Sequence, residues 1–281
     1  MSGNAKVAGI IGWPVGHSLS PALHGFWLEA HKVDGAYVPL PVAPENFSFV
    51  LDGLRRAGFK GVNLTVPHKE AGFALAHETD EAAQIAGAVN LLIFGEHGHM
   101  IGRNTDALGL EASLRDAGVH ITGETVVLFG AGGAARAGVL ALNALGAKEI
   151  RILNRNASRA EALAGSLAPK IAACLTTGPL TDWPKAASDV KLLLNTTSAG
   201  MKGKDALNLD LAPLPNDAAV CDIVYNPLET DLLKNAKARG LKTIDGLGML
   251  MHQAVPAFET FYGVRPAVTP ELRRHLEAAL K

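Results

Sequence analysis

The chain has 281 residues, of which 48% are hydrophobic and 19% charged, and its formal net charge is −1 at pH 7. This balance gives no indication of a nucleic-acid partner or of an acidic membrane surface. The chain has two cysteines, Cys174 and Cys221, which is too few for a disulfide framework or a set of thiolate metal ligands. It contains no H-E-x-x-H pattern, so the sequence does not predict a metal site. No apolar run approaches the roughly 18 residues of a membrane span, and no signal-peptide pattern follows the short apolar N-terminus. We therefore expect a soluble, cytoplasmic protein.

The first part of the chain, up to about Asn104, alternates strand-like and helix-like patterns. Helices are expected to begin near Pro21, Pro44 and Pro67, because proline suits the first helical turn. The stretch FGEHGHMIG is typical of a hairpin tip. Strands are expected over the apolar or alternating stretches Val7–Gly12, Ala36–Leu40, Val62–Thr65 and Ala88–Phe94.

The stretch GVNLTVPHKE, which starts at Gly61, has apolar side chains at every second position and then meets Pro67, which cannot continue a central strand. It delivers His68 and Lys69 to a strand-to-helix corner. From this pattern alone, Lys69 is either an ordinary surface lysine or a proton donor held in a cleft.

The second part of the chain starts near Thr125. There TVVLFGAGGAARAGVLALNALGAKEIRILNR predicts a strand, a glycine turn, a helix and a second strand. The alternation of strands and helices along the whole chain predicts an α/β fold with mostly parallel sheets. The stretch from Gly246 onward is expected to be helical, with a kink at Pro256. The other expected elements are strands at Val190–Leu194, Ala219–Val224 and Leu241–Ile244 and a helix at Glu229–Arg239.

Gly130, Gly132 and Ala135 form the pattern G-x-G-x-x-A directly after the strand-like VVLF. The first glycine permits a tight turn, the second lets the backbone approach a pyrophosphate, and the small third residue lets helix and strand pack closely. The free N–H groups of the following helix N-terminus favour phosphate. The sequence therefore predicts a dinucleotide-binding turn, with a glycine turn without a ligand as the alternative.

The second strand of this unit ends at ILNR, where an NAD site usually offers an acidic residue to the ribose 2′-OH. This chain offers Asn154 and Arg155, and Arg159 follows one helical turn later, whereas Glu149 lies at the other end of the strand. A guanidinium suits a 2′-phosphate. We therefore predict NADP as the cofactor; solvated arginines at a helix start are the alternative.

Several stretches taken together resemble the shikimate dehydrogenase family over essentially the whole chain. In order along the chain they read GHSLSPALH, NLTVPHK, GAVN, GRNTDALG, GAGGAARA, NRNASR, NTTSAGM, YNP and DGLGMLMHQA. The resemblance implies NADPH-dependent reduction of 3-dehydroshikimate to shikimate, in the route to aromatic amino acids. It also implies a two-domain fold with a cleft between the domains: a substrate-binding domain over residues 1–104, joined by C-terminal helices from about 246 to 281, and a Rossmann-like NADP-binding domain over 105–245.

By this resemblance, Lys69 and Asp106 form the proton-transfer pair. The chemistry agrees, because hydride addition to a ketone leaves negative charge on oxygen, which an ammonium group can both stabilise and protonate. A nearby carboxylate would hold the lysine and oppose the lowering of its pKa by burial. For Asp106, a structural role in the first turn of a helix is compatible with this one.

The resemblance also implies further ligands. Ser18 and Ser20, two apart and projecting to one side of an extended segment, would bind the substrate carboxylate, although Ser20 before Pro21 is also a candidate N-cap. The neutral groups of Thr65, Asn90 and Gln253 would bind ring hydroxyls. Tyr225 would lie at the cleft mouth or serve packing, and Met249 would contact the cofactor or belong to the core. The expected cofactor ligands are Gly130, Ala131, Gly132, Gly133, Ala134, Asn154, Arg155, Arg159, Thr196, Gly246 and Met249.

One departure from the family concerns the adenine side of the cofactor site. NADP-using relatives usually read Asn-Arg-Thr, and this chain reads NRN, although Asn156 can still donate to a phosphate. Three alternatives stay open: a quinate or dual quinate/shikimate dehydrogenase that uses either NADP or NAD, a non-catalytic NADP-binding protein, and another two-domain dehydrogenase. The resemblance is compatible with a monomer or a homodimer.

Overall fold

The computed structural model describes residues 1–280, which form two compact units. Unit 1 comprises Met1–Thr105 together with the C-terminal stretch that starts at Gln253, and unit 2 comprises Asp106–His252. The chain therefore passes between the units twice, after Thr105 and after His252. Helix α10 (Leu247–Tyr262) contains the second crossing.

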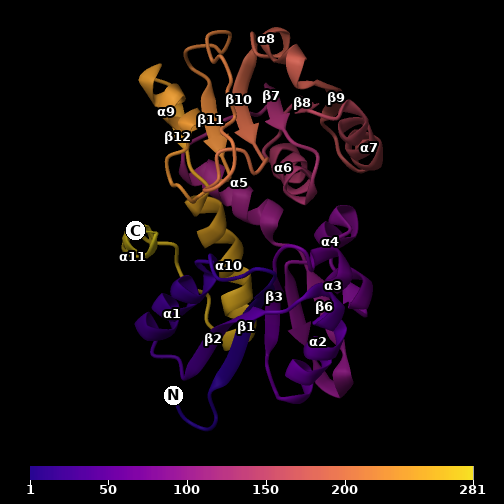
Figure 1. The fold of residues 1–281 in the computed structure, drawn as a ribbon, viewed down its shortest axis with the longest axis vertical. Coiled ribbons are helices and arrows are strands. Elements are labelled where there is room, and N and C mark those ends of the chain that lie inside the picture. Colours follow the sequence, from indigo (N-terminus) through magenta and orange to yellow (C-terminus); the bar gives the residue numbers. More distant parts are fainter. Residues whose placement is uncertain (281) are drawn as a thin grey trace. The chain divides into compact units, whose positions relative to one another are not determined.

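Unit 1 contains a six-stranded mixed sheet, sheet A, in the order β2-β1-β3-β5-β6-β4. Figure 1 labels its strands β1, β2, β3 and β6. Its strands β1, β2 and β3 are parallel to one another, whereas β5 runs antiparallel to both β3 and β6. Helix α1 packs against β2 and against α11. The strands are β1 (Lys6–Gly12), β2 (Gly35–Pro41), β3 (Gly61–Leu64), β4 (Glu78–Thr79), β5 (Leu91–Phe94) and β6 (Met100–Arg103). The helices are α1 (Ser20–Ala30), α2 (Phe47–Arg56), α3 (Lys69–Leu75), α4 (Glu81–Ala86) and α11 (Pro270–Ala279), with 3₁₀ turns η1 (Pro44–Asn46) and η2 (Glu96–Gly98).

Strand directions in sheet A bring four chain segments to one edge. The carboxyl ends of the parallel strands β1 and β3 lie at that edge, and so does the amino end of β5, since β5 is antiparallel to β3. The carboxyl end of β6 joins them, because β6 is antiparallel to β5. The residues that follow β1, β3 and β6 and those that precede β5 are therefore neighbours in space.

Unit 2 contains a six-stranded sheet, sheet B, in the order β12-β11-β10-β7-β8-β9, and every neighbouring pair is parallel (Figure 1). The residues that follow all six strands therefore lie at one edge. The strands are β7 (Thr125–Phe129), β8 (Glu149–Asn154), β9 (Cys174–Pro179), β10 (Val190–Asn195), β11 (Ala219–Asp222) and β12 (Lys242–Ile244). The helices are α5 (Asp106–Asp116), α6 (Gly133–Ala144), α7 (Ala157–Leu167), α8 (Trp183–Ala186) and α9 (Asp231–Ala238), with 3₁₀ turns η3 (Ala168–Lys170) and η4 (Leu180–Asp182).

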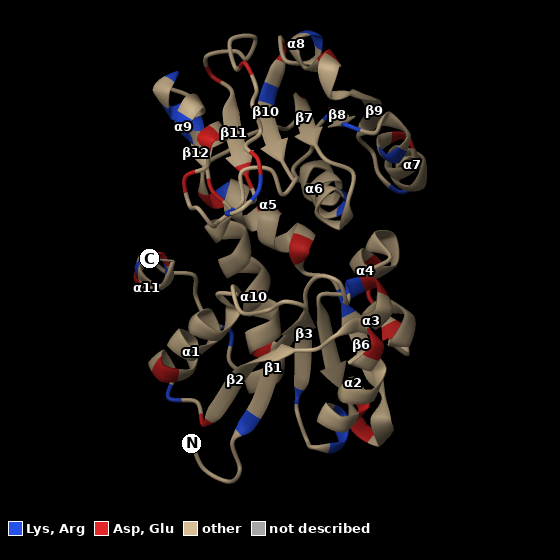
Figure 2. Ribbon diagram, in the orientation of Figure 1, with Lys and Arg blue, Asp and Glu red and all other residues tan. Residues whose placement is uncertain are grey.

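Each unit has an apolar core of its own. In unit 1, Ile11, Leu64 and Leu92 are almost fully buried in one cluster, and in unit 2 Phe129 and Leu193 are fully buried in another. Charged side chains of both signs are interspersed over both units (Figure 2). No helix within residues 1–280 is long and apolar enough to cross a bilayer.

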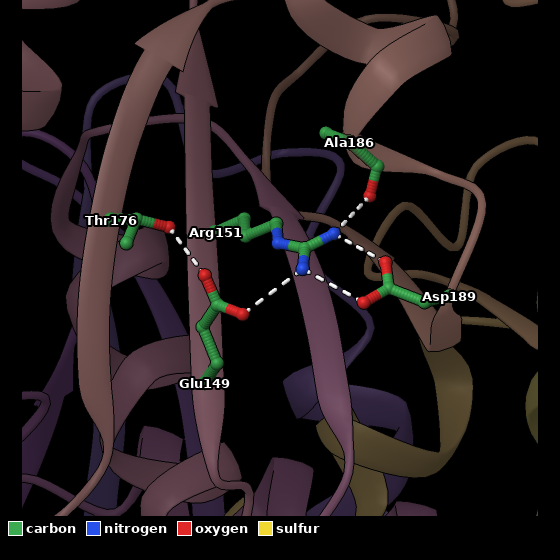
Figure 3. A network of polar contacts seen from close by, with 5 residues as sticks. All are labelled: Glu149, Arg151, Thr176, Ala186 and Asp189. Atoms are coloured by element: carbon green, nitrogen blue, oxygen red, sulfur yellow. Dashed lines mark hydrogen bonds and ion pairs between the residues drawn. The ribbon is translucent and has the colours of Figure 1, made fainter.

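At the amino end of β8 a charged network joins three segments of unit 2 (Figure 3). Arg151 Nη1 and Nη2 donate to both carboxylate oxygens of Asp189, at 2.5 and 2.9 Å, and Nη2 also donates to Glu149 at 3.0 Å. Thr176 on β9 donates to the other oxygen of Glu149, at 3.1 Å. The hydrogen bond from Arg151 holds the pKa of Glu149 and of Asp189 below their ordinary values. The network fastens the segment before β10 to β8 and β9.

The α/β class and most predicted elements are confirmed, with three corrections. Pro67 does not open a helix: α3 begins at Lys69, with His68 at its N-cap position. The strand predicted over Ala88–Phe94 starts only at Leu91. Strand β9, an edge strand that is largely exposed, was not predicted, because neither alternation nor a continuous apolar run marks its sequence, CLTTGP.

Candidate active site

The edge of sheet A gathers the polar residues that follow β3 and precede β5. Thr65 follows β3 and its N–H donates to Ile11 O at 2.9 Å, which continues the pairing with β1. Lys69 is the first residue of α3, and its carbonyl accepts from Val89 N–H at 3.0 Å, directly before Asn90. Asn90 O in turn accepts from Leu64 N–H at 2.9 Å. Backbone hydrogen bonds thus bring Asn90 to the segment that carries Thr65 and Lys69, although about 20 positions separate them along the chain.

Asn90, Thr105 and Gln253 form a hydrogen-bonded cluster at this edge. Thr105 N–H donates to Asn90 Oδ1 at 2.9 Å, and Asn90 Nδ2 lies 3.0 Å from Thr105 Oγ1 and 3.3 Å from Gln253 Oε1. Thr105 Oγ1 donates to Gln253 O at 2.8 Å. Because a backbone N–H occupies Oδ1, the orientation of the Asn90 amide is fixed. Both chain crossings are anchored in this cluster on the unit 1 side, since Thr105 and Gln253 flank them.

A buried chain of hydrogen bonds supports the cluster from inside unit 1. Tyr37 Oη donates to Asn63 Oδ1 at 2.8 Å, and Asn63 Nδ2 donates to Asn90 O at 3.0 Å. The ring of His24 stacks on that of Tyr37, with 3.8 Å between centroids. Burial raises the pKa of Tyr37 and lowers that of His24 to about 3, so both side chains are neutral at pH 7.

Ser18 and Ser20 follow β1, at the same edge of sheet A. Ser20 is buried and is the first residue of α1, and its N–H donates to Ser18 Oγ at 3.2 Å. Two interpretations of the sequence are wrong here. The segment is not extended, because Leu19 has helical backbone angles, and Ser20 is not the N-cap, because Leu19 holds that position without a side-chain bond.

His68, to which the sequence assigned no role, has a structural one. Its ring is buried, stacks on Phe47 with 4.6 Å between centroids, and places Nε2 2.7 Å from Val42 O. These contacts fix the turn that presents Lys69 at the start of α3. Asp106 is the first residue of α5 and directly follows Thr105, whose backbone is held by Asn90.

The carboxyl edge of sheet B holds a pocket of about 480 Å³. Seven of the residues predicted to bind a cofactor line it, namely Gly130, Ala131, Gly132, Asn154, Arg155, Arg159 and Thr196. The predicted ligands Gly133, Ala134, Gly246 and Met249 do not belong to its lining.

The glycine turn has the geometry that a phosphate site needs. Gly130 has φ +115°, and a Cβ there would lie 2.7 Å from Thr196 Oγ1, so no other residue fits without strain. Thr196 is buried and its hydroxyl donates to Phe129 O at 2.6 Å, which fixes this approach. A Cβ at Gly132 or Gly133 would meet nothing within 4 Å, and no side chain caps the N-terminus of α6. The backbone N–H groups there are open to an anion.

The segment after β8 supplies two arginines to the pocket. Neither the Arg155 nor the Arg159 side chain forms a hydrogen bond or ion pair within residues 1–280. Asn154 Nδ2 donates to Asn156 O at 2.9 Å, and Asn156 Oδ1 accepts from Ser158 at 2.6 Å. Asn156, which replaces the usual threonine, does not line the pocket. The residues present therefore fit a phosphorylated nucleotide, with the two arginines as its cationic side.

The remaining predicted residues of unit 2 follow β11 and β12. Burial raises the pKa of Tyr225. Gly246 lies against the backbone of Ile223 and Val224, with its N–H donating to Val224 O at 3.2 Å. Met249 lies in α10 and is partly buried.

Sequence reasoning missed the contribution of Thr105 and much of the loop after β10. The lining of the pocket also includes Leu180, Thr197, Ser198, Ala199, Lys204, Asp205, Ala206 and Leu207. The sequence did contain a signal for this loop. A loop that follows a parallel strand starts at the same edge of the sheet as the glycine turn, so the loop after β10 was a candidate for the lining. No group of three or more His, Cys, Asp or Glu residues within 1–280 could hold a metal ion.

The parallel sheet, the glycine turn before α6 and the cationic pocket define a dinucleotide-binding α/β protein of the dehydrogenase class. Two family descriptions match the chain: "Shikimate dehydrogenase substrate binding domain" over residues 10–92 and "Shikimate / quinate 5-dehydrogenase" over residues 112–202. The chain belongs to the shikimate dehydrogenase family.

Individual relatives agree with this assignment. The chain is 50% identical over 281 residues to "Shikimate dehydrogenase (NADP(+))" of Paramagnetospirillum magneticum, which covers 97% of this chain and 98% of the relative. A solved shikimate dehydrogenase in complex with NADP+ has a TM-score of 0.92 and 35% identity, covering 100% of this chain and 98% of the other. A quinate dehydrogenase from Corynebacterium glutamicum in complex with NAD has a TM-score of 0.88 and 31% identity, covering 98% and 99%.

Proposed function

We propose that this chain is an NADP-dependent shikimate dehydrogenase, which reversibly reduces 3-dehydroshikimate to shikimate. The observation that supports the proposal is the edge of sheet A. Backbone hydrogen bonds bring Lys69 to the edge that also carries Thr65 and Asn90, and the Asn90 amide bonds to Gln253. A hydroxylated ring needs a hydrogen-bond partner for each hydroxyl, which amides and hydroxyls provide, and a ketone under reduction needs a proton donor, which a lysine ammonium provides.

In the proposed reaction the bound NADPH supplies the hydride. The Lys69 ammonium donates a proton to the ketone oxygen and stabilises the charge that develops there. Asp106 is proposed to orient the lysine and to favour its charged form. Ser18 and Ser20 are proposed to bind the substrate carboxylate, which suits the tight turn that holds the two serines together. Tyr225 is proposed as a further substrate contact.

On this proposal, residues 1–104 and the helices from about 246 bind the substrate, and residues 105–245 bind NADP. The support in unit 2 is the glycine turn together with Arg155 and Arg159, whose side chains have no partner in the described part of the chain. Gly133, Ala134, Gly246 and Met249 stay proposed contacts outside the pocket lining. Cytoplasmic localisation and the monomer-or-dimer state stay predictions.

A steady-state assay of the purified protein with shikimate and quinate, each with NADP and with NAD, tests the proposal. We expect shikimate with NADP to give the highest kcat/KM of the four. No oxidation of shikimate with either cofactor would contradict the proposal.

Quinate is the second candidate substrate, because the description that matches residues 112–202 names both acids. Quinate carries an additional hydroxyl on the carbon that bears the carboxylate. That hydroxyl would have to find a hydrogen-bond partner beside Ser20, which is buried, with only 4% of its surface exposed. A buried hydroxyl without a partner costs about 1–3 kcal/mol. We therefore favour shikimate.

A further inference from the structure

The loop after β10 brings a third cation to the pocket at the carboxyl edge of sheet B. Lys204 lines this pocket together with Arg155 and Arg159, although about 50 positions separate it from them along the chain. Neither the family motifs nor the glycine fingerprint points to this lysine, since it lies beyond the stretch NTTSAGM.

None of the three cationic side chains has a protein partner within residues 1–280. Arg155, Arg159 and Lys204 form no side-chain hydrogen bond and no ion pair there. Asp205 is the one acidic residue of the lining, and it pairs with none of them. Three cations and one carboxylate around a single pocket leave a positive excess, which favours an anionic ligand.

Backbone hydrogen bonds hold the loop in its course. Gly200 N–H donates to Asp205 O at 2.7 Å, and Lys204 N–H donates to Met201 O at 2.8 Å. Gly200 and Gly203 have φ of +84° and +81°, which other residues adopt only with strain. In this fixed loop Lys204 lines the pocket, whereas Lys202, whose N–H donates to Asn226 O at 2.9 Å, does not.

The wall near Lys204 is apolar. Ala206 and Leu207 follow it in the lining, and Leu180, which follows β9, belongs to the same pocket. Leu180 and Leu207 both pack against the core of unit 2. Apolar side chains beside cations suit a purine base that carries a phosphorylated ribose.

We propose that Lys204 binds the 2′-phosphate of NADP together with Arg155 and Arg159, and so determines the preference for NADP over NAD. This inference rests on the proposed NADP-dependent function. Lys204 acts as a direct ligand whose charge the 2′-phosphate pairs, while NAD offers it no such group. Asn156 does not line the pocket, and with Lys204 as a third cation the 2′-phosphate has enough partners without it.

Titration calorimetry with 2′,5′-ADP and with 5′-AMP tests the proposal on the full chain without turnover. We expect Lys204→Ala to weaken binding of 2′,5′-ADP about tenfold, the effect of one charge-assisted hydrogen bond, and to leave 5′-AMP binding unchanged. Lys202→Ala is the matched control, since it removes an equal charge from the same loop outside the pocket, and it should change neither affinity. Steady-state kinetics should show the same split, with KM raised for NADP alone.

Two patterns of weakening would overturn the inference, and so would an unchanged affinity of Lys204→Ala for 2′,5′-ADP. Equal weakening of 2′,5′-ADP and 5′-AMP would place Lys204 at a phosphate that both ligands share, and equal effects of Lys204→Ala and Lys202→Ala would leave only a general charge effect. Arg155→Ala separates this failure from failure of the proposed function. If Arg155→Ala weakens 2′,5′-ADP and Lys204→Ala does not, the NADP site stands and only Lys204 is excluded.

Discussion

At the residue scale, the side chain of Lys69 has the most demanding proposed task. The backbone of Lys69 is held by neighbours as well as by α3, because Val89 N–H donates to its carbonyl and the ring of the preceding His68 contacts Phe47 and Val42 O. A proton donor must be held within hydrogen-bond reach of its target, about 2.6–3.2 Å between heavy atoms. These contacts fix the backbone from which the Lys69 side chain extends.

We expect Lys69→Ala to lower kcat for shikimate by about 10²-fold or more, the usual scale for loss of a proton-transfer group. KM should change much less, because the interaction is made mainly in the transition state. Stopped-flow and steady-state measurement of NADPH formation give both parameters. Lys60→Ala, at the opposite end of β3 and exposed, is the control that should retain normal activity. A Lys69→Ala enzyme that keeps a tenth of the normal rate when chemistry is limiting would exclude Lys69 as the catalyst.

His24 predicts a pH-dependent loss of stability. Its pKa is about 3 in the folded protein because the ring is fully buried, against 6.5 for a free histidine. As the pH falls below 6.5, the unfolded chain therefore binds a proton that the folded chain does not, and the free energy of unfolding decreases. Between pH 6.5 and 5 this amounts to roughly 2 kcal/mol.

His24→Phe should remove that dependence, because phenylalanine does not titrate and can keep the stacking on Tyr37. It also removes Nδ1, which is buried without a hydrogen-bond partner within residues 1–280. Urea unfolding of both proteins at pH 7 and pH 5 measures the difference. An identical loss of stability on acidification in the two proteins would show that His24 is not its source.

At the scale of elements, the Arg151 network joins β8, β9 and the segment before β10 (Figure 3). The network lies at the amino ends of the strands of sheet B, whereas the pocket lies at their carboxyl ends. The network therefore contributes to the stability of unit 2 without touching the proposed ligand site.

Arg151→Met should lower the free energy of unfolding by about 1–2 kcal/mol at pH 7, a charge-assisted network discounted for partial solvent screening. Arg151 lowers the pKa values of Glu149 and Asp189, so this contribution is complete above their ordinary values of 4.5 and 3.8. It is lost progressively as the pH falls below those values, through the lowered pKa values of the folded protein. Thermal unfolding at pH 7 and at pH 3.5 should show the difference between variant and wild type shrinking. A constant difference would mean that packing of the arginine stem, not its charge, matters.

At the scale of the whole molecule, the two units divide the proposed task between substrate and cofactor. Selectivity for the acid then depends on unit 1, and selectivity for the nucleotide on unit 2. The chain crosses between them at Thr105 and at His252, and the unit 1 side of both crossings is bonded to Asn90.

We expect kcat/KM for shikimate to exceed that for quinate by about 10²-fold, since quinate would place an unpartnered hydroxyl beside Ser18 and Ser20. Ser18→Ala and Ser20→Ala should each raise KM for shikimate with smaller effects on kcat. Initial-rate measurements with both acids at saturating NADP give these ratios. Comparable values for the two acids would favour the dual-substrate alternative and leave the hydride-transfer chemistry intact.

Patterns within short stretches of the sequence were enough to predict many of the strands and part of the candidate cofactor site. Apolar alternation located β3, short apolar runs located β1 and β7, and the glycines at 130 and 132 marked the turn before α6. These patterns are readable because hydrophobic period and backbone freedom are properties of short stretches. The arginines at 155 and 159 were found for the same reason, since they follow a recognisable strand.

Tertiary structure alone decided which distant residues meet. Thr105 joins Asn90 and Gln253 only because β5 and β6 run antiparallel while α10 returns to unit 1. Lys204 reaches the pocket only because every strand of sheet B ends at one edge. Local propensity also gave the wrong first residue for α3, which begins at Lys69, two residues after Pro67. Strand order and direction depend on the packing of the whole core, and no single stretch of sequence contains that information.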